Sequence, residues 1–125
     1  MGIKGRSAKG RITGIGGVFF RARDREQLAA WYGEVLGLEV TDSATSKMGT
    51  TVWAAFAHDT AYFGPGEQDH MINYRVDDLD AARARLVEAG TTVSPDIDED
   101  EYGRFSWAVD PEGNRFELWE PAEGR

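Results

Sequence analysis

Stretches in which apolar and polar residues alternate predict several β-strands along this chain. Near the C-terminus, residues 107–120 predict a strand, a turn and a second strand, because Asp110-Pro111-Glu112-Gly113-Asn114 is a run of turn-forming residues. Side chains on the second of these strands alternate between two faces. One face carries Phe116 and Leu118, and the other carries Arg115, Glu117 and Trp119. The second face is either exposed to solvent or part of the wall of a concave site.

A strand followed by an aspartate, an amphipathic helix and a glycine occurs twice. The first copy comprises residues 12–37 and the second comprises residues 71–90. Asp24 and Asp78 stand where each helix begins, and aspartate is a favoured helix-capping residue. Further strands are expected after the helices, at residues 38–44, 50–57 and 61–63, and then at 91–93, 105–109 and 115–119. Each half of the chain therefore has the predicted order βαβββ.

This repeat predicts an α+β fold with one structural domain. We expect two tandem βαβββ modules, residues 12–66 and residues 67–125, that form a curved eight-stranded mixed sheet. The sheet is expected to be a partly open barrel with the helices on its outer face, since two helices are too few for a parallel α/β fold. Residues 1–11 are rich in Gly, Ser and Lys without an apolar period, which predicts a flexible basic tail.

Composition excludes several classes of function. The 125 residues are 41% hydrophobic and 29% charged, as in a globular domain with a core. The net charge of -8 and the pI of about 4.7 argue against nucleic acid as a partner, because phosphates require clustered Lys and Arg. No apolar run is long enough to span a membrane. Without cysteine there is no disulfide or thiolate zinc site. Absent cysteine fits any compartment, and we expect a cytoplasmic protein as the default.

Several motifs, in this order, resemble the vicinal oxygen chelate superfamily, which includes glyoxalase I, bleomycin-resistance proteins, fosfomycin-modifying transferases and extradiol dioxygenases. The resemblance covers residues 12–121 and implies the fold described above. It says less about function, because these functions share one scaffold. The motifs that carry it are Ala22-Arg23-Asp24, Trp31-Tyr32 with Leu36-Gly37-Leu38, Val76-Asp77-Asp78-Leu79, and Asp110-Pro111-Glu112-Gly113-Asn114 with Phe116-Glu117-Leu118.

The resemblance also implies where metal-binding relatives hold their ligands. The matching positions are Gly17 on the first strand, Met71 on the strand that opens the second module and Glu117 on the last strand, and no acid lies between residues 59 and 66. One of four expected ligands remains. His70 is one residue from the expected place, so strand alternation turns it away from the site unless a β-bulge precedes it. We therefore predict no metal, with Glu117 and His70 as the ligands if a divalent metal ion is present.

The inward-facing side chains instead predict a small-molecule cavity with aromatic walls and a few polar groups. The alternative is that Arg21, Arg75 and Glu117 pair with one another or coat an exposed sheet. The inward set is Gly17, Phe19, Arg21, Met71, Asn73, Arg75, Arg115, Glu117 and Trp119, and the rim is expected at Tyr102, Arg104 and Trp107. The five acids within residues 96–101 are expected to form a solvated loop, or else to help bind a basic ligand.

These observations lead to two hypotheses of different class. The first is a glyoxalase- and bleomycin-resistance-like protein that binds or sequesters a small molecule without a metal or other cofactor, as a homodimer. The second is a divalent-metal-dependent lyase or dioxygenase of the glyoxalase type with an atypical ligand set. If any residue is catalytic, we expect it to be Glu117, which would need a raised pKa in a dry pocket.

Overall fold

The computed structural model describes residues 9–41, 44–48 and 50–124, which form two helices and seven strands in one mixed sheet. This agrees with the predicted α+β class. The elements, in chain order, are β1 (Ile12–Ala22), α1 (Arg25–Leu36), β2 (Thr45–Met48), β3 (Thr51–Ala57), β4 (His70–Val76), α2 (Leu79–Glu88), β5 (Asp98–Asp100), β6 (Gly103–Val109) and β7 (Arg115–Pro121).

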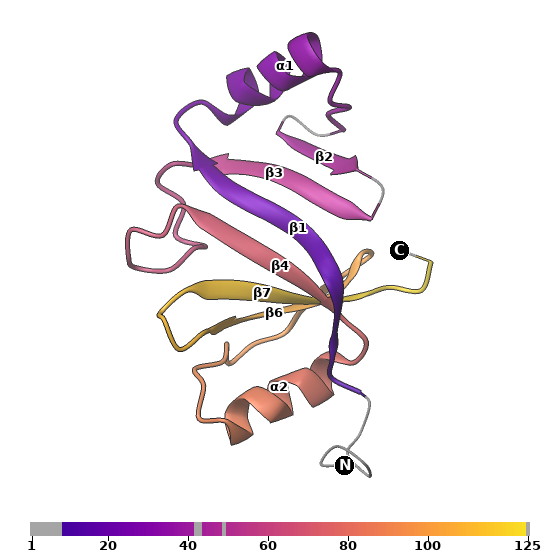
Figure 1. Ribbon diagram of the computed structural model, residues 1–125, viewed down its shortest axis with the longest axis vertical. Coiled ribbons are helices and arrows are strands. Elements are labelled where there is room, and N and C mark those ends of the chain that lie inside the picture. Colours follow the sequence, from indigo (N-terminus) through magenta and orange to yellow (C-terminus); the bar gives the residue numbers. More distant parts are fainter. Residues whose placement is uncertain (1–8, 42–43, 49, 125) are drawn as a thin grey trace.

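The sheet has the order β2-β3-β1-β4-β7-β6-β5 and is curled into a half-barrel (Figure 1). Strands β1 and β3 are parallel, as are β4 and β7, and the two halves of the chain meet where β1 and β4 pair antiparallel. The second half thus contributes β4, β7, β6 and β5, whereas the described part of the first half contributes β1, β3 and β2. Two matching βαβββ modules are therefore not confirmed.

The prediction of eight strands was wrong at particular places. Residues 61–63 form a turn, and the described part of 38–44 contains no strand, so the first half has its extra strand at β2 instead. The stretch at residues 91–93 is reduced to a single bridge between Val93 and Ala108. The acidic run that was expected to be a loop supplies β5, which pairs with β6.

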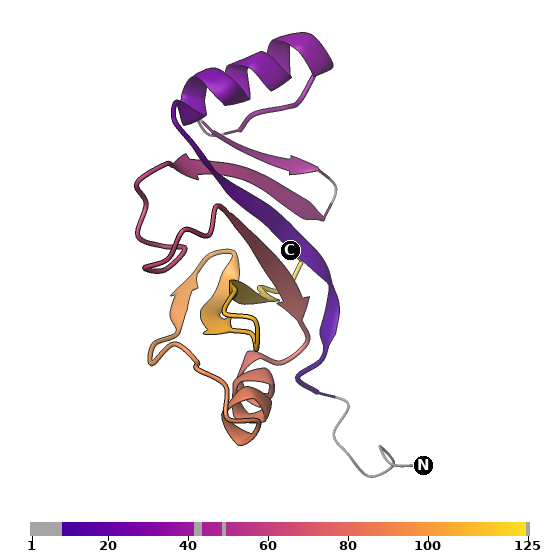
Figure 2. The ribbon, with the colours of Figure 1, turned by 60° about the vertical axis from the view of Figure 1, so that its left-hand side comes forward.

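The two faces of the sheet carry different cores. On the helix-facing side, α1 packs over a cluster with Trp53 and Ala55, and α2 packs over one with Val76 and Leu118. The opposite face carries a third cluster, which comprises Phe19, Ala54, Phe63 and Met71. The helices lie at opposite ends of the molecule with the strands between them (Figures 1 and 2). The face opposite the helices is thus left to form a site.

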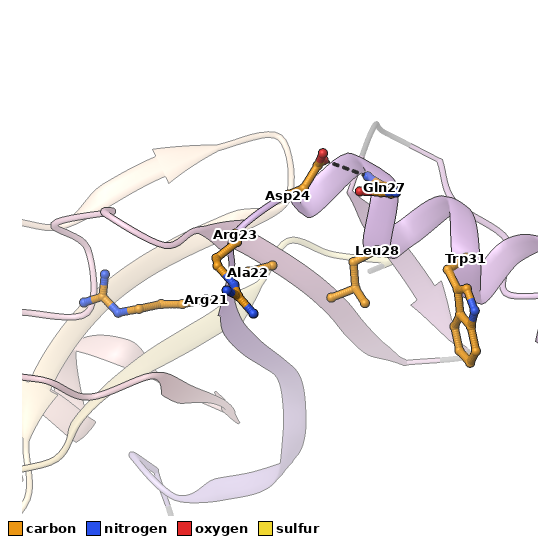
Figure 3. Close-up of a pocket in the computed structure, with 7 residues that line it drawn as sticks. All are labelled: Arg21, Ala22, Arg23, Asp24, Gln27, Leu28 and Trp31. Atoms are coloured by element: carbon orange, nitrogen blue, oxygen red, sulfur yellow. Dashed lines mark hydrogen bonds between the residues drawn. The ribbon is translucent and has the colours of Figure 1, made fainter.

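Both helices begin at the predicted capping residues. The Asp24 carboxylate accepts a hydrogen bond from the backbone N–H of Gln27 at 3.0 Å, and Figure 3 shows this contact. Asp78 caps α2 in the same way through the N–H of Ala81. Gly37 ends α1 in the left-handed conformation with φ of 75°, which a side chain would disfavour. Local sequence therefore determines where the helices begin.

Part of the predicted basic tail is bound to the domain. The backbone N–H groups of Gly10 and Arg11 both donate to the Asp77 carboxylate, at 2.6 and 3.0 Å, and Arg85 donates to the carbonyl of Lys9. The expectation of a flexible tail is therefore not met at residues 9–11, while residues 1–8 lie outside the described part of the chain. No helix among the described residues has the length and apolar character needed to cross a membrane.

The packing of α2 gives a direct test of the fold. Leu79 is completely buried in the cluster under α2, so we expect Leu79→Ala to lower the free energy of unfolding by about 2–5 kcal/mol. Val87 on the same helix is 65% exposed, and Val87→Ala should change it by less than about 0.5 kcal/mol. Urea unfolding of both variants measures the difference, and equal losses would contradict this placement of the helix.

Candidate ligand-binding site

The direction of the side chains on β4 determines which of its residues are available on the concave face. Met71 packs against Phe19 in the concave-side cluster, whereas Val76 and Tyr74 pack under α2. Because side chains alternate along a strand, Asn73 and Arg75 lie on the same face as Met71. This agrees with the orientation that the sequence favoured, in which Met71 and not His70 faces inward.

A cavity of about 410 Å³ lies on this concave face and uses strands from both halves of the chain. Phe105 and Trp119 stack in its wall, with ring centroids 5.8 Å apart and an angle of 9° between the rings. The Trp119 indole N–H donates to the carbonyl of Tyr102 at 2.8 Å, which fixes the ring. The described lining residues are Gly16, Phe19, Thr41, Thr45, Lys47, Val52, Asn73, Tyr102, Phe105 and Trp119.

A buried polar pair links the two central strands beneath this cavity. Asn73 on β4 and Glu117 on β7 are register partners, and the Asn73 amide N–H donates to the Glu117 carboxyl at 2.6 Å. Both residues are buried, and burial raises the pKa of Glu117 to about 8. The Asn73 Oδ1 atom has no hydrogen-bond partner among the described residues. A buried acceptor without a partner costs about 1–3 kcal/mol.

A β-bulge in β1 makes room for this pair. The register with β4 shifts between Ile15 and Gly17, so Gly16 is the additional residue. A Cβ atom on Gly16 would overlap Asn73 Oδ1 and lie 2.9 Å from the Trp119 ring. Asn73 therefore occupies the space that a side chain on the first strand would fill. The resemblance to the superfamily placed the ligand position at Gly17, one residue further along β1, and nothing in the sequence indicated the bulge.

His70 does not share a site with Glu117. It lies on the helix-facing side of β4, where its ring is 6.5 Å from that of Phe20, and it is exposed to solvent. Its Nδ1 atom is 2.6 Å from the Asp69 carboxylate, and this contact lowers the pKa of Asp69. No group of three or more His, Cys, Asp or Glu side chains that could hold a metal ion occurs in the part of the chain that the structure describes. Because His70 lies on the other face of β4, no imidazole of the described chain lies beside Glu117, and these residues do not fit a metal centre.

Two arginines that were predicted to face the cavity, Arg75 and Arg21, make different contacts. Arg75 lies over the Trp119 ring, 4.7 Å from its centroid. Arg21 donates to the carbonyls of the β3–β4 loop at His58, Thr60 and Gln68, so it anchors that loop. The alternative expectation was that Arg21, Arg75 and Glu117 pair with one another. No ion pair joins these three side chains among the described residues.

The three residues expected at the rim of the cavity lie in different places. Tyr102 lines the cavity, but Arg104 points the other way and binds Asp80 of α2 at 3.0 and 3.1 Å. Arg104 is therefore not a rim residue, because it alternates with Phe105 on β6. The acids of β5 are all exposed and none of them lines the cavity. Trp107 lies outside the lining as well and stacks with Arg115, whose guanidinium carbon is 3.6 Å from the ring centroid.

Sequence reasoning found four of the lining residues and missed others. Phe19, Asn73, Tyr102 and Trp119 were named. Phe105 could have been found, because strand alternation places it on the same face as the predicted Trp107. Nothing in the sequence predicted that residues before and within β2 would line the same cavity as residues of β6 and β7. Their positions on the two sides of the cavity depend on how the sheet curls. The missed residues are Gly16, Thr41, Thr45, Lys47, Val52 and Phe105.

Known proteins share this fold. A family model described as a glyoxalase-like domain matches residues 17–119. Among curated proteins, none matches the sequence. The methylmalonyl-CoA epimerase of Mycobacterium tuberculosis is 24% identical over 89% of this chain and 89% of its own, with a TM-score of 0.65. A variant of the Streptomyces coelicolor methylmalonyl-CoA epimerase, in complex with 2-nitronate-propionyl-CoA, is 18% identical over 90% of this chain and 99% of its own, with a TM-score of 0.71.

A third structural neighbour carries a different name. A structure described as the NAD-dependent benzaldehyde dehydrogenase of Legionella pneumophila is 13% identical over 85% of this chain and 98% of its own, with a TM-score of 0.60. At these identities the likeness concerns the fold alone. Function has to be argued from the residues in the cavity.

The raised pKa of Glu117 predicts a pH-dependent stability. Unfolding returns the carboxyl to an ordinary value near 4.5, so the folded protein binds more protons between that pH and about 8. The contribution of Glu117 is fully present below the lower value and is lost as the pH rises to the upper one, by at most about 1.4 kcal/mol per pH unit. Glu117→Gln should remove this slope and be more stable than the parent above pH 8.

Denaturant unfolding of both proteins across this pH range is the measurement. Gln keeps an oxygen that can accept the Asn73 hydrogen bond, so the comparison isolates the proton. Parallel pH profiles of the two proteins would show that Glu117 ionises normally.

Proposed function

Because the chain belongs to the glyoxalase-like domain family, we propose that it binds a small, neutral, partly aromatic molecule in the concave cavity without a metal ion. In this proposal the protein holds the molecule and does not convert it chemically. The observation that carries this proposal is the composition of the lining: stacked aromatic rings from the second half face apolar side chains, two threonines and one lysine from the first half.

The charge of the cavity supports a neutral ligand over a basic one. Lys47 is the one charged residue among the described lining residues, and it repels cations. Glu117 favours its neutral form and lies behind Asn73, so it offers little negative charge. The acidic run that suggested a basic ligand is exposed at β5, away from the lining.

The position of Glu117 favours binding over catalysis. A general acid must lie within hydrogen-bond reach of the reacting group. Glu117 has the raised pKa of a proton donor, but it is absent from the cavity lining, and one of its carboxyl oxygens accepts the Asn73 hydrogen bond. The metal-dependent lyase or dioxygenase is less well supported, because the face that holds Glu117 does not hold His70.

A homodimer belongs to the same proposal. The outer face of α1 exposes Trp31, Val35 and Leu36, and β1 exposes Ile12 and Ile15. Trp31 and Val35 lie one helical turn apart on α1, and neighbouring exposed apolar side chains are typical of contacts between protein molecules. These observations support self-association, and the molecular mass in solution tests it.

A matched pair of ligands tests the charge of the cavity. Tryptophol and tryptamine differ in carrying a neutral hydroxyl or an ammonium group on the same ring system. We expect tryptophol to shift the indole N–H signal of Trp119 in an NMR titration, and tryptamine to bind about five-fold more weakly, since like charges a few ångströms apart repel by about 1 kcal/mol. In Lys47→Gln the two affinities should become similar.

Two phenylalanines provide the control for the aromatic wall. Phe105→Leu removes the ring that stacks on Trp119 and should weaken tryptophol about three- to ten-fold. Phe116→Leu removes a ring that contacts Tyr74 on the helix-facing side and should leave binding unchanged. Tighter binding of tryptamine, or no Trp119 shift with tryptophol, indole and naphthalene at their solubility limits, would contradict the proposal.

Metal analysis separates binding from the metal-dependent alternative. We expect protein purified without chelators to contain far less than one divalent ion per chain, because the described residues place no group of three or more His, Cys, Asp or Glu side chains around Glu117. Elemental analysis of the parent and of Glu117→Gln makes the measurement. One tightly bound ion per chain that is lost in the variant would establish the alternative.

A further inference from the structure

A second pocket, of about 430 Å³, lies between the β3–β4 loop and the β6–β7 turn. The two segments lie on the same side of the molecule in Figure 1. This pocket shares none of its described lining residues with the concave cavity. Its walls combine apolar Phe63, Pro65 and Val109 with the side chains of Gln68 and Arg115.

The Arg115 guanidinium is the chemically distinctive group in this pocket. One face contacts the Trp107 ring at 3.6 Å, and Nη1 donates to the carbonyl of Tyr62 at 3.2 Å. Gly64, with φ of 96°, allows the backbone to approach, since a Cβ there would lie 3.2 Å from Nε. A guanidinium has five N–H donors in a planar fork. Within the described chain, the other N–H groups of this side chain have no hydrogen-bond partner.

No acid among the described residues forms an ion pair with this cation. The ion pairs within 4 Å among the described residues do not include Arg115, although the chain has 22 acids against 14 lysines and arginines. Burial therefore lowers the pKa of Arg115 without an opposing effect, whereas the Asp80 carboxylate raises the pKa of Arg104. A partly buried charge without a partner is unfavourable unless an anion is supplied from outside.

The walls of the pocket are fixed before any ligand binds. The Gln68 side chain accepts from the N–H of Arg115 at 2.8 Å and donates to its carbonyl at 2.6 Å, which joins the loop to the start of β7. In the opposite wall, the Asp110 carboxylate accepts from the N–H groups of Glu112 and Asn114, both at 2.9 Å. Preorganised walls lower the entropy lost on binding.

We propose that this second pocket binds the carboxylate of a small organic acid through Arg115, with the apolar body of the acid against Pro65 and Val109. The fork of guanidinium N–H groups matches a carboxylate, which accepts two parallel hydrogen bonds. Exposed Glu67 in the lining disfavours a doubly charged anion such as phosphate more than a singly charged one. This site goes beyond the proposed function, because it is separate from the concave cavity and takes a ligand of opposite character.

Benzoate and inorganic phosphate are the probes, and the indole N–H signals of Trp107 and Trp119 report on the two pockets. Benzoate should shift Trp107 in a saturable manner and leave Trp119 unchanged, and phosphate should bind more weakly. Arg115→Gln should weaken benzoate about ten-fold or more. Arg23→Gln removes the same charge from an exposed residue outside this lining and should have little effect.

A second variant leaves the arginine and its stacking intact. Glu67→Gln removes the negative charge from the lining and should strengthen benzoate about two-fold, which a merely structural Arg115 would not explain. No Trp107 shift with benzoate, or equal losses in Arg115→Gln and Arg23→Gln, would overturn the proposal. Tighter binding of phosphate would also overturn the assignment to a carboxylate. The tryptophol titration at Trp119 is independent of all these outcomes.

Discussion

The hydrogen bond between Asn73 and Glu117 is the interaction on which the rest of the site depends. It joins the two parallel central strands of the second half at a buried position, where an ionised carboxylate would be strongly disfavoured. Burial keeps Glu117 largely neutral, and the neutral carboxyl can accept from an amide without needing a counter-ion. A position that could have carried a metal ligand thus becomes part of a polar but uncharged support beneath an aromatic cavity.

The division of the sheet into two faces follows from the same strands. Helix α1 covers one end of the outer face and α2 covers the other, so apolar residues there form closed cores. The concave face is only partly filled, by Phe19, Met71 and their neighbours, and the remainder forms the cavity. At the other end of β7, Arg115 lies in a pocket of its own. One strand therefore positions a cationic group, a neutral acid and an aromatic ring in succession along one face.

Much of this arrangement could be predicted from periodicity and turn chemistry. Alternation on β4 and β7 correctly separated Met71 and Glu117 from His70, and capping residues located both helices. The sequence could not reveal the bulge at Gly16, because an inserted residue leaves no mark on composition. Arg104 was misplaced because charge suggested a pocket rim, while its position in β6 turns it toward Asp80. The position of β2 across the cavity from β6 and β7 depends on how the sheet curls, which no local pattern encodes.

The site described above requires that Glu117 be a buried, neutral carboxyl held by Asn73 on the concave face. Titration of the Glu117 side-chain carboxyl, followed by its carbon chemical shift in selectively labelled protein, measures this property. We expect a midpoint at about pH 8, with loss of the shift change in Glu117→Gln. A midpoint near the ordinary value of 4.5 would show that the carboxylate is solvated or paired with a cation, and that Glu117 is not held in its neutral form.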